Sequence, residues 1–90
     1  MNDKYKILLD ETAEQEVRYI SFMGNFHRYD FAIFNAREDN KKIVIDLRKN
    51  RFAMLTKNDL TEEGVIEHEF HVTEIEADEL REFLKGALYY

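Results

Sequence analysis

The sequence of 90 residues contains no cysteine and no proline, and it has only three glycines. Without cysteine, the chain can form neither a disulfide framework nor a thiolate zinc site, and it has no cysteine nucleophile. Small secreted domains usually need disulfides to compensate for a thin core, so this absence favours a reducing compartment. The glycines, at positions 24, 64 and 86, are isolated from one another, which excludes the glycine-rich loops that bind phosphates and dinucleotides.

Long apolar runs are also missing. No wholly apolar stretch exceeds four residues, whereas a membrane-spanning helix needs about 20. Residues 1–10 carry scattered charges and lack the apolar segment of a signal peptide. We therefore expect a cytoplasmic protein with no membrane segment.

What the sequence does contain is the apolar and aromatic content of a folded chain. Hydrophobic residues make up 44% of it, with seven Phe and five Tyr, whereas disordered chains are poor in aromatics. A chain of this length is expected to form one domain. We divide residues 1–90 into an N-terminal segment over 1–16, a β-meander over 17–72 and a helix over 73–88.

Charge is distributed unevenly along the chain. The formal net charge is −6, but residues 37–57 carry a net charge of +4 and residues 58–90 a net charge of −8. Such asymmetry governs which partners each surface attracts and says nothing about the fold.

Alternation of apolar and polar residues predicts an antiparallel meander of five or six strands. The predicted strands cover residues 17–23, 29–35, 42–47, 52–56 and 66–72, with an optional short first strand over 5–9. Asn50 occupies a tight turn in which it can adopt a positive φ.

The best-defined predicted element is a C-terminal amphipathic helix. Thr73 followed by Glu76 forms a capping box, and Val72 and Ala77 would make the accompanying hydrophobic staple. One helical face then carries apolar residues, namely Ala77, Leu80, Phe83, Leu84, Ala87 and Leu88. The predicted fold class is therefore α+β, with this helix packed on one face of the sheet.

The predicted strands over 29–35 and 42–47 carry apolar side chains on both of their faces. An antiparallel sheet with one solvated face should instead alternate cleanly. Since one helix covers only one face, the second face needs another cover. That cover is strong sheet curvature, the N-terminal segment or another subunit.

Several stretches of the chain resemble a small family of uncharacterised cytosolic proteins from Bacillus- and Staphylococcus-type bacteria. The stretches that carry the likeness are residues 18–24 (RYISFMG), 28–33 (RYDFAI), 51–56 (RFAMLT), 58–60 (NDL), 64–70 (GVIEHEF) and 79–84 (ELREFL). The resemblance covers most of residues 17–85. It implies a bacterial cytosolic location and supplies no catalytic residue.

The histidines and two aspartates are the candidates for chemistry. His68 and His71 would point to opposite faces of a strand, which argues against a metal site; we expect His68 on the apolar row and His71 in water. His27 and Asp30 could act as a general acid and base. We prefer another role for Asp30, in which it pairs with an arginine and stabilises the turn. For Asp46 we prefer a cross-strand ion pair with Arg51 or Arg18.

The basic turn formed by Arg48, Lys49 and Arg51 suggests nucleic-acid binding, which needs several convergent cations. The net charge of −6 argues against this function, and no predicted strand shows the aromatic spacing of an RNA-binding sheet. A solvated turn, or a contact with an acidic protein, is preferred.

Together these observations favour a non-enzymatic protein-interaction module, either a homodimer or bound to an unidentified protein partner, with no cofactor and no metal. Two alternatives remain open. One is a small enzyme or ligand-binding protein with a site near His27, Asp30 and Asp46. The other is a nucleic-acid accessory protein that uses the basic turn over residues 48–51.

Overall fold

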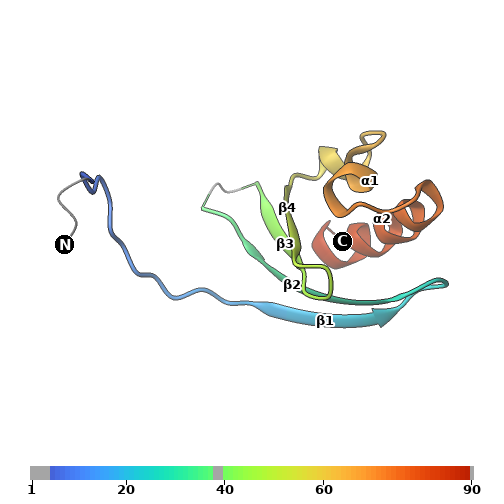
Figure 1. Cartoon of the computed structure of the whole chain (residues 1–90). Coiled ribbons are helices and arrows are strands. Elements are labelled where there is room, and N and C mark those ends of the chain that lie inside the picture. Colours follow the sequence, from blue (N-terminus) through green and yellow to red (C-terminus); the bar gives the residue numbers. More distant parts are fainter. Residues whose placement is uncertain (1–4, 38–39, 90) are drawn as a thin grey trace.

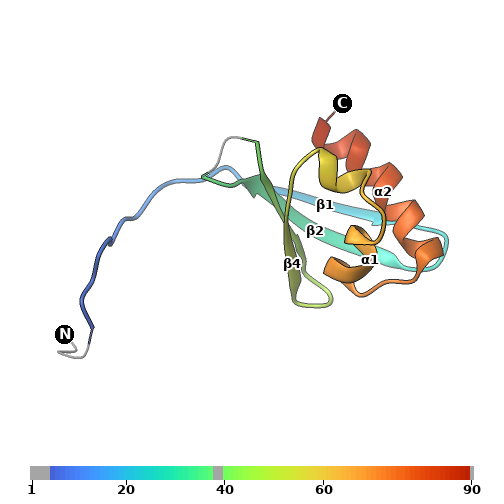
Figure 2. The same cartoon turned by 90° about the horizontal axis from the view of Figure 1, so that it is seen from above.

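The computed structural model describes residues 5–37 and 40–89. Its strands form a four-stranded antiparallel sheet in the order β1-β2-β3-β4. The strands are β1 (Arg18–Met23), β2 (Arg28–Asn35), β3 (Lys42–Asp46) and β4 (Arg51–Leu55). They are followed by a 3₁₀ turn, η1 (Asn58–Leu60), and two helices, α1 (Val65–Phe70) and α2 (Glu74–Tyr89). Both helices lie on the same side of the sheet (Figures 1 and 2).

The α+β class and the antiparallel meander are confirmed, but the predicted number of strands is wrong. Residues 66–72 were assigned to a strand because of their alternation, yet residues 65–70 form α1. Ile66 and Phe70, four positions apart, are both buried, whereas His68 between them is exposed. A spacing of four fits one face of a helix. Residues 5–9 form no strand either.

The capping box of α2 is confirmed. Thr73 Oγ1 accepts a hydrogen bond from the Glu76 N–H at 3.2 Å, and Glu76 Oε1 accepts one from the Thr73 N–H at 3.0 Å. The predicted apolar face of α2 is turned toward the sheet: Ala77, Leu80 and Leu84 are completely buried. The helix therefore begins and packs as the sequence indicates.

The core lies between the sheet and the two helices and is rich in aromatic rings. Phe22 of β1 stacks on Phe83 of α2 with ring centroids 3.7 Å apart, and Phe31 of β2 contacts Phe70 of α1 with centroids 5.9 Å apart. Side chains of alternate strand residues complete it, including Val44. Each strand therefore contributes one of its two faces to this single core.

The turn between β3 and β4 has two local determinants. Asn50 adopts the predicted positive φ, at 55°. The Asp46 carboxylate accepts the backbone N–H groups of Arg48 at 3.1 Å and Lys49 at 3.2 Å. Asp46 is thus buried by closing the turn on itself. Among the described residues, this carboxylate does not form the ion pair with Arg51 or Arg18 that was predicted. The two backbone N–H groups of the turn are its hydrogen-bond donors instead.

Residues 5–17 precede β1 as an arm that extends away from the sheet and helices (Figures 1 and 2). Its apolar side chains are exposed, with Leu8 at 88% and Leu9 at 68%. Among the described residues, no helix is long and apolar enough to cross a membrane.

Candidate interaction surface

The side of the sheet opposite the helices carries two continuous apolar rows. Strand register aligns Tyr19, Ala32, Ile45 and Phe52 across all four strands. A second row joins three strands through Phe34, Ile43 and Met54. We call this surface the outer face and define it by these seven residues. No helix that the structure describes covers it (Figure 1).

The two ends of the first row are the most exposed parts of the outer face. Tyr19 is 73% exposed and Phe52 is 64% exposed, while Met54 in the second row is 45% exposed. Ala32 in the middle is nearly buried, because larger side chains on the neighbouring strands flank it. The outer face is therefore a cross-strand apolar surface open to a partner.

A polar corner adjoins the outer face where Ser21 of β1 pairs with Asp30 of β2. The Ser21 hydroxyl donates a hydrogen bond to the Asp30 carboxylate. Arg28 lies 3.1 Å from that carboxylate and Arg48 lies 3.4 Å from it. The hydrogen bond from Ser21, followed by those from the two arginines, lowers the pKa of Asp30. The predicted arginine pairing of Asp30 is confirmed, and it reaches across to the basic turn.

The basic turn over residues 48–51 is not purely solvated, because two of its side chains bond to other parts of the chain. Arg48 reaches Asp30, and Arg51 Nε donates to the Glu69 carbonyl of α1 at 3.2 Å. The Lys49 backbone binds Asp46, and its side chain is exposed. The cations of this turn thus point in different directions, so they do not form one convergent phosphate site.

His27 belongs to the turn between β1 and β2, and it contacts α2 rather than Asp30. Its Nε2 forms an ion pair with the Glu76 carboxylate. The hydrogen bonds from Thr73, followed by His27, lower the pKa of Glu76. The contact therefore fastens the first hairpin of the sheet to the start of α2.

A second carboxylate of α2 reaches the same turn. Glu79 Oε2 accepts the Asn25 N–H at 2.7 Å. A Cβ atom on Gly24 would lie 1.8 Å from Glu79 Oε1, so a side chain at this position would displace the Glu79 carboxylate from the turn. Burial, followed by the charges of nearby carboxylates, raises the pKa of the adjacent Tyr29 to about 12. These contacts position the hairpin, whereas Tyr29 Oη and Glu79 Oε1 are buried at the junction without a hydrogen-bond partner among the described residues.

The three residues predicted as an alternative enzyme site do not converge. His27 contacts α2, Asp30 belongs to the polar corner on the opposite side of the sheet, and Asp46 closes the turn after β3. General acid–base catalysis requires a side chain within hydrogen-bond reach of the proton that it transfers. His27, Asp30 and Asp46 lie in three separate places, so they do not act together on one reacting group.

Of the two C-terminal histidines, His71 faces water as predicted, but His68 does not lie where it was predicted. His68 is exposed on α1 instead of facing the core, because α1 is a helix and not a strand. His71 is exposed and ends α1 with a φ of 52°. Among the described residues, no group of three or more His, Asp or Glu side chains could hold a metal ion.

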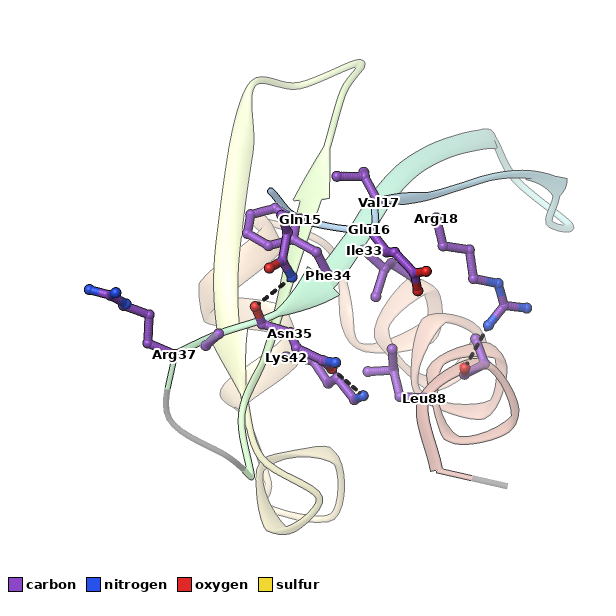
Figure 3. Close-up of a pocket in the computed structure, with 12 residues that line it drawn as sticks. Gln15, Glu16, Val17, Arg18, Ile33, Phe34, Asn35, Arg37, Lys42 and Leu88 are labelled. Atoms are coloured by element: carbon purple, nitrogen blue, oxygen red, sulfur yellow. Dashed lines mark hydrogen bonds between the residues drawn. The ribbon is translucent and has the colours of Figure 1, made fainter. Parts of the chain in front are cut away.

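An open hollow of about 840 Å³ lies between the base of the arm, β2 and the end of α2 (Figure 3). Several of its polar side chains bond within the chain: Gln15 donates to the Asn35 carbonyl at 3.0 Å, and Arg18 donates to the Ala87 carbonyl at 2.9 Å. Lys42 donates to the Asn35 side chain. Ligand sites are concave, with polar groups that converge on the ligand. The polar groups of this hollow instead hold the base of the arm and the end of α2 against the sheet.

A family model named SAV0927-like matches residues 8–86, from within the arm to the last turns of α2. The chain belongs to the SAV0927-like family. This family is uncharacterised, in agreement with the resemblance inferred from the sequence, and assigns no reaction or ligand. No curated protein matches this SAV0927-like chain.

Sequence reasoning missed part of the outer face in this SAV0927-like chain. Strands with two apolar faces were expected over residues 29–35 and 42–47, without a choice of side, yet Phe52 and Met54 of β4 extend the apolar rows. The alternation of these two residues with the buried Ala53 and Leu55 was the available signal. Only the positions of the helices decide which side of each strand is exposed.

Proposed function

We propose that this chain is a non-enzymatic protein-interaction module of the bacterial cytosol that buries its outer face against a second copy of itself. The observation that carries the proposal is the pair of apolar rows across the sheet, which the described helices leave uncovered. Monomers rarely expose contiguous apolar patches larger than about 300–600 Å². Twofold homodimers are the commonest arrangement that covers such a patch.

The distribution of polar groups supports the same function. An enzyme needs a concave site with convergent polar side chains, whereas the candidate residues of this chain are spread over three places and bond to their own neighbours. The likeness to Bacillus- and Staphylococcus-type proteins supports a cytosolic setting. The absence of cysteine agrees with a reducing compartment.

The test places charges on the outer face and measures mass in solution. We expect the full-length protein to have twice the chain mass of 10.9 kDa in light scattering. The variant Tyr19→Lys/Phe52→Lys should have the mass of one chain, because lysines at both ends of the first row oppose each other across the interface.

Ile75→Lys is the matched control, since Ile75 is 66% exposed at the start of α2, on the helix side of the sheet. It should remain dimeric. A wild-type protein that has the mass of one chain even at several hundred micromolar, or a dimer that the double variant leaves intact, would contradict the proposal.

A further inference from the structure

We infer that the N-terminal arm of one copy covers the outer face of the other copy, so that the dimer forms by exchange of arms. This inference rests on the proposed function and names the segment that occupies the surface. It starts from two exposed apolar surfaces in one chain. One is the outer face, and the other is the run Ile7–Leu9, whose three side chains are 52%, 88% and 68% exposed.

Apart from its base, where Glu11, Ala13 and Gln15 line a hollow together with Phe34 and Ile43, the arm does not cover the outer face of its own chain. Its base is fastened at one end of the sheet, where Gln15 donates to the Asn35 carbonyl and Arg37 pairs with Glu11. From there residues 5–10 extend away from the sheet (Figures 1 and 2). The anchored base thus directs the apolar tip toward a neighbouring molecule.

The area of the outer face shows that a second covering element is needed. Four strands at about 4.8 Å spacing make a surface about 19 Å wide, and five residues at about 3.4 Å make it about 17 Å long. Two such faces in contact give a flat area of only about 650 Å², whereas stable interfaces bury about 1,200–2,000 Å². The same rows cannot be buried twice, so an arm laid across each face replaces the face-to-face contact and adds its own surface to the buried area.

The length of the arm fits this role. Residues 5–11 span about 20 Å when extended, which is enough to cross a face about 17 Å long. Tyr5, Ile7 and Leu9 fall on one side of an extended chain, because side chains alternate. One side of the arm can therefore pack on the apolar rows along its whole length.

Charge favours the same occupant. Residues 10–16 of the arm contain four carboxylates and no basic side chain. Residues 37–57, which include β3 and β4, carry a net charge of +4. Arg28 and Arg48 border the outer face at the polar corner. Glu11 is paired with Arg37 of its own chain, so Asp10 is the carboxylate that the exchanged segment carries toward this basic border, which attracts it.

Disulfide trapping tests the exchange directly, because the chain has no cysteine of its own. We would mix the single variants Ile7→Cys and Met54→Cys, one of them isotopically labelled, and oxidise the mixture. Mass spectrometry should find a disulfide between position 7 of one copy and position 54 of the other. The control pair Ile7→Cys and Ile75→Cys should give at least tenfold less product, because Ile75 lies on the helix side.

The double variant Ile7→Cys/Met54→Cys distinguishes exchange from a folded-back arm. Exchange gives linked chains of twice the mass, whereas a link within one chain, at the mass of one chain, would overturn the inference. Leu9→Asp should weaken the dimer at least tenfold, and Thr12→Asp, with the same charge change three residues away, much less.

Failure of this inference is separable from failure of the proposed function. A dimer that Tyr19→Lys/Phe52→Lys dissociates, but that shows neither the 7–54 link nor sensitivity to Leu9→Asp, would reject arm exchange and leave the outer face as the interface. A monomer under all conditions would reject both.

Discussion

Glu76 performs three tasks at once. It completes the capping box with Thr73, it places a negative charge in the first turn of α2, and it binds His27 of the first hairpin. Each of these interactions is stronger when the carboxylate is ionised. Glu76 therefore couples the start of the helix to the sheet in a way that depends on pH.

Replacing this charge should make the stability less dependent on pH. The hydrogen bonds from Thr73 and the contact with His27 lower the pKa of Glu76 from its ordinary value of 4.5. A carboxyl whose pKa is lower in the folded state stabilises fully above its unfolded pKa, and this contribution disappears as the pH falls through the folded pKa. Glu76→Gln should therefore cost about 0.3–1 kcal/mol at pH 7 and almost nothing well below pH 4.

Urea unfolding at several pH values measures this difference. Glu82→Gln is the matched control, because the Glu82 side chain is 79% exposed further along the same helix. The difference in unfolding free energy between this variant and the wild type should change much less with pH. If the difference in unfolding free energy between Glu76→Gln and the wild type stays constant from pH 7 to about pH 3, the linkage argument is contradicted.

Residues whose roles are decided locally could be predicted from the sequence. The capping box of Thr73 and Glu76 and the positive φ of Asn50 depend on neighbours a few positions away. The partners of Asp46 and His27 could not be predicted in this way. Asp46 had several candidate donors, and His27 contacts a helix that is distant in sequence, so the packing of elements decides both.

At the scale of elements, the length of the periodic segment decided which predictions succeed. The pattern of α2 repeats over 16 residues and has its cap, so only a helix fits it. The segment over 66–72 is too short to distinguish a period of 2 from a spacing of 4. Gly64 and His71, both with positive φ, isolate α1 as a single short helix between turns.

Docking of α2 on the sheet should dominate the stability of the domain. Leu80 and Leu84 are completely buried against the core, so Leu80→Ala or Leu84→Ala should each cost about 2–5 kcal/mol through lost burial and the cavity left behind. Domains of this kind are stable by only about 5–15 kcal/mol in total. Each variant should therefore shift the urea midpoint strongly.

Glu82→Ala serves as the control for α2, because it truncates an exposed side chain between the two leucines. Its midpoint should remain within about 0.5 kcal/mol of the wild type in free energy. Unchanged midpoints for both leucine variants would show that α2 does not pack as described.

At the scale of the whole molecule, the sheet separates two surfaces of different character. The helix side encloses the core and carries most of the acidic C-terminal third, whereas the outer face is apolar and borders the basic segment. The sequence indicated that a second apolar face exists, because its central strands are apolar on both sides. It could not indicate that α1 joins α2 on the same side and leaves that face uncovered.

The charge of the whole molecule argues against the nucleic-acid alternative. Phosphate binding needs several cations that converge, but Arg48 contacts Asp30, Arg51 contacts the Glu69 carbonyl, and the net charge is −6. We therefore expect negligible binding to labelled single-stranded RNA or DNA in fluorescence anisotropy, even at about 50 mM salt, where phosphate contacts are strongest. Arg48→Ser/Lys49→Ser/Arg51→Ser should bind no less than the wild type. Micromolar binding by the wild type with a steep salt dependence, lost in this triple variant, would instead establish the basic turn as a nucleic-acid site.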